Sequence, residues 1–231
     1  MSDFSQQPSV TLSFGPSGYG KTTFCLKYLV NALHAQPFNP SPAACIFIFD
    51  WKQDEISRRL GVGSVTTEDG CEKSLAQKIV VFNPHVMFPG DKRVRNPEGE
   101  KVLNDDRMGL RWFCKWAYEV SARGPGRKII YLDDLANFGC KYAVPPELSR
   151  IIRTGRFVGL ELLTSTQYPR DYHADIRGGV TEWVCFKCTE ENDLAAVRPY
   201  FSAVDKVKDL QRGQFISYSR DFETELAGKM F

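Results

Sequence analysis

Gly15-Pro-Ser-Gly-Tyr-Gly-Lys-Thr-Thr23 is the stretch of the sequence that decides the fold. It follows the apolar run Val10–Phe14, and it precedes residues 24–33, where apolar side chains recur at helical spacing. The pattern of a glycine, four residues, then Gly-Lys-Thr, placed between a strand and a helix, is that of a phosphate-binding loop. The sequence therefore predicts a strand, a loop and a helix that together bind a nucleoside triphosphate.

The residue types in this stretch explain the chemistry. Gly15, Gly18 and Gly20 let the backbone wrap closely around phosphates, because a Cβ atom would block the conformations needed. Backbone N–H groups and the helix N-terminus then offer partial positive charge to phosphate oxygens. Lys21 is expected to reach the β- and γ-phosphates, and the Thr22 hydroxyl to bind Mg²⁺. The predicted nucleotide-binding residues are Gly15, Pro16, Ser17, Gly18, Tyr19, Gly20, Lys21, Thr22 and Thr23.

Composition limits the class of protein. The 231 residues suit one α/β domain spanning 1–231, and the 42% hydrophobic content is ordinary for a protein with a buried core. The chain has 30 Lys and Arg against 28 Asp and Glu, so its net charge does not by itself indicate binding to nucleic acid. No apolar run reaches the ~18 residues of a membrane helix, and the first residues do not form a signal peptide. We expect a protein without a transmembrane segment.

The seven cysteines are odd in number and scattered. Several lie in apolar segments, which indicates small buried residues in a reducing compartment. Cys185 and Cys188 form a lone CxxC pair with no second Cys or His pair at zinc spacing, so we do not expect a structural metal there.

Apolar runs alternate with helical patterns along the chain. This alternation predicts an α/β fold with a mainly parallel central sheet, helices on both faces and right-handed crossovers. Residues from about 85 to 102 are rich in Pro, Gly and charge and are expected to form a long loop, and the tail after residue 219 is expected to be polar. Further strands are predicted at residues 43–49, 78–82, 127–133, 158–165, 181–186 and 214–219, and helices at 53–60, 103–122, 145–154 and 190–199.

Asp133 and Asp134 end the apolar strand predicted at residues 127–133. An acid at the end of a hydrophobic strand, downstream of a phosphate-binding loop, is the Walker B pattern. We expect Asp133 to hold Mg²⁺ through the second coordination shell. Asp134 is expected to orient or deprotonate the attacking water.

Gln167 follows the next predicted strand. A polar amide at the tip of the strand beside the Walker B strand can hydrogen-bond the γ-phosphate and respond to its loss. We therefore expect Gln167 to act as the γ-phosphate sensor.

The combination of motifs resembles the FtsK–HerA superfamily of DNA-pumping ATPases. The resemblance rests on the phosphate-binding loop, on Asp50-Trp-Lys52 after the second strand, on Asp133-Asp134, and on Leu148-Ser-Arg-Ile-Ile-Arg-Thr-Gly-Arg-Phe-Val-Gly-Leu160 before Thr164-Ser-Thr-Gln167. Within that superfamily the small size is similar to the genome-packaging ATPases of membrane-containing icosahedral double-stranded DNA viruses. The resemblance covers nearly the whole chain.

This resemblance implies a RecA-like core with ATP and Mg²⁺ as cofactors, a ring-shaped homo-oligomer, expected to be a hexamer, and ATP-driven movement of double-stranded DNA. It also implies capsid-vertex or portal partners, and a location in the host cytoplasm and at the packaging vertex of the virion. In such rings an arginine of one subunit completes the neighbour's site. Arg153 and Arg156 match that position. Many members place Glu after the Walker B Asp, whereas this chain has Asp134, so Asp50 is a second candidate for activating water.

A basic cluster in the long loop is the candidate contact with DNA. A basic loop that projects into a ring's pore would hold phosphates without reading bases. A solvated surface loop is the alternative. The residues are Lys92, Arg93, Arg95 and Lys101.

Other functions remain open at this point. A Zot-like phage assembly ATPase shares the core but extrudes single-stranded DNA at a membrane. A slow, nucleotide-gated structural switch would keep the loop without rapid turnover. A small-molecule kinase would need a lid and an acceptor site, and the sequence has no pattern for either.

Overall fold

The protein is described here from a computed structural model, which covers residues 10–34, 44–52, 55–88, 93–95, 101–138, 140–220 and 224–230. At residues 93–95 and 101–106 it describes the backbone alone. Within these ranges, no helix combines the length and apolar character needed to cross a membrane.

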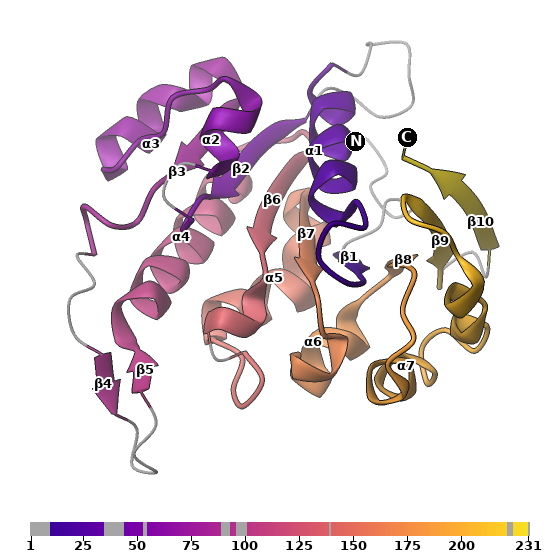
Figure 1. Ribbon diagram of the computed structural model, residues 1–231. Coiled ribbons are helices and arrows are strands. Elements are labelled where there is room, and N and C mark those ends of the chain that lie inside the picture. Colours follow the sequence, from indigo (N-terminus) through magenta and orange to yellow (C-terminus); the bar gives the residue numbers. More distant parts are fainter. Residues whose placement is uncertain are drawn as a thin grey trace.

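One eight-stranded sheet forms the centre of the fold (Figure 1). Its strands lie in the order β10-β9-β8-β1-β7-β6-β2-β3. The six strands from β8 to β3 are parallel, β9 is antiparallel to β8, and β10 is antiparallel to β9. The strands are β1 Val10–Phe14, β2 Cys45–Phe49, β3 Ile79–Phe82, β6 Lys128–Asp133, β7 Leu160–Thr166, β8 Glu182–Phe186, β9 Gln214–Ser219 and β10 Thr224–Lys229.

The helices pack on both faces of this sheet. They are α1 Lys21–Leu33, α2 Glu55–Leu60, α3 Glu68–Ser74, α4 Asn104–Ala122, α5 Pro146–Thr154, α6 Ala174–Gly179 and α7 Glu191–Val197. Five short 3-10 helices join them: η1 Leu75–Gln77, η2 Leu135–Phe138, η3 Gly155–Val158, η4 Pro169–Asp171 and η5 Val204–Asp209.

Side-chain alternation along the strands builds a separate core on each face. Ile46 and Ile48 of β2 pack with Leu29 of α1, whereas Phe47 and Phe49 point the other way, toward α4. β2 and β3 are accordingly apolar throughout, as parallel strands covered by helices often are, whereas β7 is buried along its whole length but bears several polar side chains. The predicted fold class is confirmed.

The order of strands positions the site. β7 pairs with β1 on one side and with β6 on the other, so it separates the strand that leads into Gly15–Thr23 from the strand that ends at Asp133. The carboxyl ends of all three strands lie at one edge of the sheet, where open parallel sheets bind ligands.

Two predictions about irregular segments were wrong. The region from about 85 to 102 contains two short strands, β4 (Arg93–Arg95) and β5 (Lys101–Leu103), which pair antiparallel at the start of α4 (Figure 1). Residues 214–219 were predicted as the last strand, whereas the polar residues after them form a further strand, β10, which pairs with β9 over six residues. β10 pairs with the edge of the central sheet and β4 and β5 pair with each other, and this pairing overrides the weak strand pattern of their sequences.

Candidate active site

The phosphate-binding loop leaves β1 and enters α1, as predicted. Gly15, Gly18 and Gly20 have φ angles of 142°, 78° and 115°, a region of backbone conformation that favours glycine. Gly20 is the N-cap of α1, and Lys21 is its first residue. The N-terminus of α1 and the N–H groups of the loop thus face the edge of the sheet where phosphates can bind.

Glycine is required at Gly15 and Gly20 for a second reason. A Cβ atom on Gly15 would lie 2.8 Å from Cβ of Phe186, and one on Gly20 would lie 3.0 Å from the Phe186 ring. Phe186 is the last residue of β8 and fully buried. Tyr19 is half-buried and packs against the cluster of Val184, Phe186 and Met230, the first two of which belong to β8. The loop therefore rests on β8.

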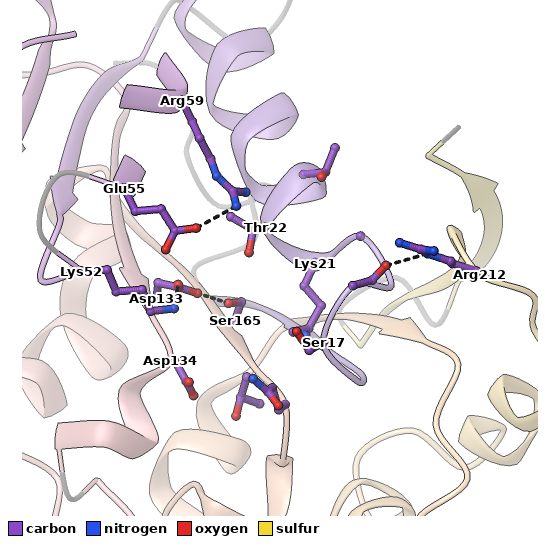
Figure 2. Close-up of a pocket in the computed structure, with 15 residues that line it drawn as sticks. Ser17, Lys21, Thr22, Lys52, Glu55, Arg59, Asp133, Asp134, Ser165 and Arg212 are labelled. Carbon is purple, nitrogen blue, oxygen red and sulfur yellow. Dashed lines mark hydrogen bonds and ion pairs between the residues drawn. The ribbon is translucent and has the colours of Figure 1, made fainter. Parts of the chain in front are cut away.

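A cavity of about 530 Å³ lies in front of this loop (Figure 2). Its walls come from the loop, the start of α1, the turn after β2, α2, the ends of β6 and β7, and the turn before β9. The lining residues are Ser17, Gly18, Gly20, Lys21, Thr22, Thr23, Lys52, Glu55, Arg59, Asp133, Asp134, Ser165, Thr166, Gln167 and Arg212. The structure thus brings together the predicted loop lysine, both acids and the sensor amide.

Lys21 is nearly buried, with 8% of its surface exposed. Its ammonium donates a hydrogen bond of 2.9 Å to the Pro16 carbonyl. Burial lowers the pKa of Lys21, although the charges of Asp133 and Asp134 oppose this. The lysine is therefore held inside the curve of the loop, where it can reach phosphate oxygens.

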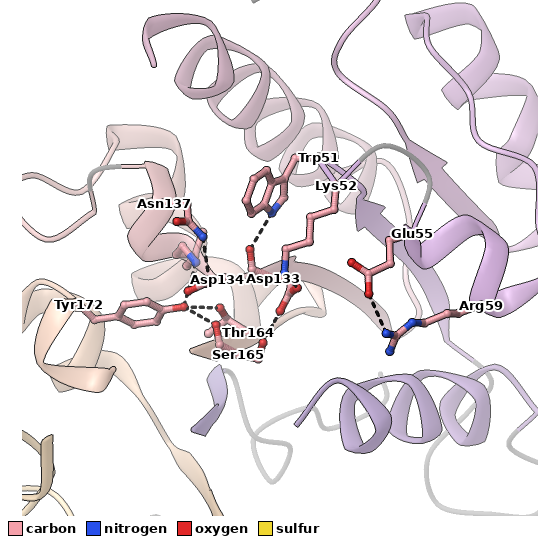
Figure 3. Close-up of polar contacts among 11 residues, drawn as sticks. Trp51, Lys52, Glu55, Arg59, Asp133, Asp134, Asn137, Thr164, Ser165 and Tyr172 are labelled. Atoms are coloured by element: carbon pink, nitrogen blue, oxygen red, sulfur yellow. Dashed lines mark hydrogen bonds and ion pairs between the residues drawn. The ribbon is translucent and has the colours of Figure 1, made fainter. Parts of the chain in front are cut away.

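Asp133 ends β6 and is 5% exposed. Its Oδ1 accepts a hydrogen bond from the Ser165 hydroxyl, and its Oδ2 lies 2.6 Å from the Lys52 ammonium (Figure 3). Burial lowers the pKa of Lys52, but the charge and hydrogen bond of Asp133 outweigh this effect and raise that pKa above its ordinary value. Asp133 is thus a buried carboxylate that already faces a cation.

The predicted Mg²⁺ residues fit such an ion. Thr22 and Asp133 line the same cavity and offer hard oxygen donors. No three His, Cys, Asp or Glu side chains among the described residues form a cluster able to hold a metal by themselves. This agrees with the way Mg²⁺ usually binds, through one or two protein oxygens, several waters and the phosphates of a substrate.

Asp134 adopts a left-handed backbone conformation, with φ of 54°. Its N–H donates to the Ser165 carbonyl at 2.9 Å, and the Asn137 side-chain amide donates to Asp134 Oδ2 at 2.8 Å. Burial raises the pKa of Asp134, and the charge of Asp133 adds to the effect. The side chain is positioned at the mouth of the cavity as a carboxylate with increased affinity for a proton.

Tyr172 braces the backbone around both acids (Figure 3). Its buried hydroxyl donates to the Ser165 carbonyl at 2.7 Å and accepts the Leu135 N–H at 3.0 Å. The Thr164 hydroxyl lies 3.0 Å from the Tyr172 hydroxyl oxygen. The ends of β6 and β7 are therefore fixed relative to each other.

Gln167 and Asp50 have different surroundings. Gln167 follows β7 directly and lines the cavity, in agreement with its predicted position. Asp50 is 1% exposed, and its Oδ2 accepts the Ser57 N–H of α2 at 2.8 Å. It is not among the residues that line the cavity, so Asp134 has the better position for contact with a water.

Arg153 and Arg156 lie at the other end of β7. They line a separate cavity of about 450 Å³, together with Asp175 and Arg220. The Arg156 guanidinium lies 5.1 Å from the centre of the exposed Phe157 ring, and Arg153 is 3.8 Å from Asp175. β7 has seven residues, which corresponds to about 20 Å, so these arginines do not reach their own chain's cavity.

The predicted DNA-contacting residues are only partly described. Lys92 lies outside the described residues. Arg93 and Arg95 are in β4 and Lys101 is in β5, where the backbone pairs Arg95 with Lys101. Their side chains lie outside the description.

Sequence reasoning missed several residues of the cavity. Lys52, Ser165 and Thr166 were noted only as parts of motifs, and Glu55, Arg59 and Arg212 were not proposed. Arg59 pairs with Glu55 at 2.7 Å on α2, and Arg212 donates to the Gly18 carbonyl at 3.0 Å. Lys52 and Ser165 come at or just after strand ends, a signal that could have identified them, whereas Arg212 is 194 residues from its partner.

Comparison with protein-family models gives no match, and comparison of the sequence with curated proteins gives none either. Among solved structures, the genome packaging NTPase B204 of Sulfolobus turreted icosahedral virus 2, in complex with AMP, has a similar fold. The TM-score is 0.70, with 20% identity over 96% of each chain.

Two further structures have a similar fold. VirB4 of Thermoanaerobacter pseudethanolicus has a TM-score of 0.63 and 11% identity, over 95% of this chain and 88% of the other. The pCW3 conjugation coupling protein TcpA, in its monomer form with ATPγS, has a TM-score of 0.54 and 16% identity, over 98% of this chain and 61% of the other. At these identities the likeness establishes the fold.

Proposed function

We propose that this chain is an ATPase motor that moves double-stranded DNA and packages a viral genome into a preformed capsid. The observation that carries the proposal is the single cavity in which Lys21, Thr22, Asp133, Asp134 and Gln167 meet. The likeness in fold to a viral genome packaging NTPase supports the direction of the proposal.

These five residues of the cavity have distinct proposed roles in hydrolysis. Lys21 and the loop N–H groups bind the β- and γ-phosphates. Thr22 and Asp133 would hold Mg²⁺, and the bound ion would neutralise charge on the phosphate oxygens. Asp134 orients the attacking water and accepts its proton, a task that its raised pKa favours. Gln167 hydrogen-bonds the γ-phosphate and responds to its release.

The motor is proposed to work as a homo-oligomeric ring, with residues 1–231 as one ATPase domain. Arg153 and Arg156 are exposed at the edge of the sheet opposite the cavity, which suits a head-to-tail contact between subunits. One of them stabilises charge on the phosphoryl group bound by the neighbour. A capsid vertex or portal protein is the expected docking partner, and the host cytoplasm and the virion vertex are the expected locations.

Mixed rings test this arrangement. Lys21→Ala disables a subunit's own site, and one of the two variants Arg156→Ala and Arg153→Ala disables the site of its neighbour. Lys21→Ala and that arginine variant should each lose ATP turnover when tested alone. In a random equal mixture of Lys21→Ala with the arginine variant, about a quarter of the interfaces pair an intact site with an intact arginine. We expect about a quarter of wild-type turnover to return.

Two controls accompany the mixtures. Lys73→Ala removes an exposed lysine whose partner, Asp69, is one helical turn away, and it should leave turnover unchanged. The arginine variants should still bind a fluorescent ATP analogue. Wild-type turnover in Lys21→Ala would contradict the assigned site, and no recovery in the mixtures of either arginine variant would contradict the shared one.

A further inference from the structure

Lys52 is a second lysine in the cavity, beside the carboxylate assigned to Mg²⁺ (Figure 3). Its ammonium lies 2.6 Å from Asp133 Oδ2, while the Ser165 hydroxyl donates to Oδ1. Both oxygens of the buried Asp133 carboxylate therefore have a protein donor. A buried carboxylate needs such a countercharge, because its removal from water is costly.

The backbone at Lys52 is tied to Asp133 through the preceding residue. The Trp51 indole N–H donates to the Asp133 carbonyl at 3.1 Å, and the Trp51 ring packs edge-on against Phe138, with centroids 5.2 Å apart. The Trp51 carbonyl is 2.8 Å from His85 Nε2. These contacts hold the Lys52 backbone in place on the cavity wall.

The Lys52 side chain, by contrast, has room to move. It is 32% exposed, against 6% for the Asp133 side chain, and it is flexible along its four-carbon stem. It lines the same cavity as Lys21 and Thr22. A rotation of the side chain can therefore bring its ammonium from Asp133 to phosphate oxygens bound at the loop.

A divalent ion at Thr22 and Asp133 competes with the Lys52 ammonium for the same carboxylate. Two cations so close together repel each other strongly in a partly buried site. A nucleotide resolves the conflict, because its phosphates offer the displaced ammonium several negative oxygens. The cavity is lined by the basic residues Lys21, Lys52, Arg59 and Arg212 and by the acids Glu55, Asp133 and Asp134.

We propose that Lys52 occupies the cation position at Asp133 in the nucleotide-free chain and moves onto the phosphates when the divalent ion and the nucleotide bind together. Lys52 is then a phosphate-binding residue that also excludes a metal ion from the empty site. The metal and the nucleotide bind cooperatively, because each removes an obstacle to the other. The inference rests on the proposed binding of ATP at the loop.

Replacement of the lysine by a neutral residue tests the exclusion of metal. Mn²⁺ is titrated into the nucleotide-free protein and followed by electron paramagnetic resonance. We expect Lys52→Met to bind Mn²⁺ roughly 5- to 150-fold more tightly than the wild type, the usual range for a coupling between two sites. Lys52→Gln keeps a hydrogen-bond donor for Asp133 and should change affinity in the same direction, even if Lys52→Met does not fold.

The second readout is the binding of a fluorescent, non-hydrolysable ATP analogue with Mg²⁺. Lys52→Gln should weaken it at least about tenfold, because one cationic contact with the phosphates is lost. Lys52→Arg retains the charge and should keep the wild-type Mn²⁺ affinity. The control Lys73→Met removes a lysine that is exposed and paired with Asp69, and it should leave both affinities unchanged.

The outcomes separate this inference from the proposed function. If the wild type binds the analogue and Lys21→Ala does not, the loop is a nucleotide site. Under that condition, Mn²⁺ affinity that is unchanged or weaker in Lys52→Gln overturns the inference about Lys52, and so does unchanged affinity for the analogue. If the wild type binds no nucleotide at all, the proposed function fails first.

Discussion

Asp134 combines two unusual properties for a single residue. Its backbone has a positive φ, which aspartate and asparagine tolerate better than other side chains. Its carboxylate is partly removed from water and lies near the negative charge of Asp133, and both effects raise its pKa. The position thus holds an ionised acid at a cost in stability, as active sites often do.

Asp134→Asn should therefore raise stability while it abolishes turnover. A raised pKa in the folded state means that the folded protein binds this proton more tightly than the unfolded chain. Ionised Asp134 thus lowers the free energy of unfolding at pH 7. Asparagine removes the charge and suits the same backbone. We expect a higher melting temperature than wild type at pH 7, with turnover reduced about 10²- to 10⁴-fold.

The stability gain should depend on pH in a defined direction. It is full above the raised pKa, and it shrinks as the pH falls toward the ordinary Asp value of 3.8, below which the wild-type carboxyl is protonated in both states. Thermal melts at pH 7 and at pH 4.5 measure the difference. A lower melting temperature for Asp134→Asn at pH 7 would contradict this explanation.

The sequence predicts residues of the site whose role follows from a local motif. Lys21, Thr22 and Asp133 stand at fixed distances from a strand or a helix start, and all of them line the cavity. Lys52 and Ser165 both contact Asp133, although they are 81 and 32 residues away from it in the sequence. Such pairs depend on the order of strands in the sheet, which local patterns do not specify.

Among the secondary-structure elements, the phosphate-binding loop and β8 pack so closely that they form one structural unit. A Cβ atom at Gly15 would clash with Cβ of Phe186, and one at Gly20 would press against the Phe186 ring. The loop conformation therefore depends on β8, a strand that follows it by more than 160 residues. Correct pairing of β1 with β8 is a precondition for a nucleotide site.

Gly15→Ala should disrupt this unit. The new Cβ would lie 2.8 Å from Cβ of Phe186 in a backbone conformation with φ of 142°. We expect a loss of about 1–3 kcal/mol in the free energy of unfolding, measured by urea denaturation, and loss of ATP-analogue binding. The control is Gly63→Ala, because a Cβ at Gly63 meets no atom within 4 Å. Wild-type stability and binding in Gly15→Ala would contradict the packing described here.

Elements with buried, apolar strands could be predicted, and exposed ones could not. β2 and β6 are nearly all buried, so their apolar runs are unambiguous. β10 is exposed along almost its whole length, and its sequence, TELAGK, lacks an apolar pattern. β4 and β5 have only three residues each, and three of these six are Arg or Lys. The structure describes the pairing of β4 with β5 through their backbones.

At the scale of the whole molecule, the two edges of the sheet that are joined by β7 carry different groups. One edge of the sheet bears the cavity with Gln167, and the opposite edge bears the exposed Arg153, Arg156 and Phe157. This polarity suits a ring in which the arginine edge of one subunit faces the cavity of the next. The resemblance in sequence implied such a ring. The fold it implied is confirmed, and the ring and the DNA partner stay predictions.

The central claim is that ATP hydrolysis at Gly15–Thr23 drives movement along double-stranded DNA. The most direct test is the steady-state ATP turnover of the wild-type protein without DNA, with single-stranded DNA and with duplex DNA, beside Lys21→Ala. We predict turnover that duplex DNA raises about tenfold or more and that Lys21→Ala lacks under every condition. A near-zero rate that no DNA changes would contradict the claim and favour a nucleotide-gated switch, and stimulation by single strands alone would favour an extrusion ATPase.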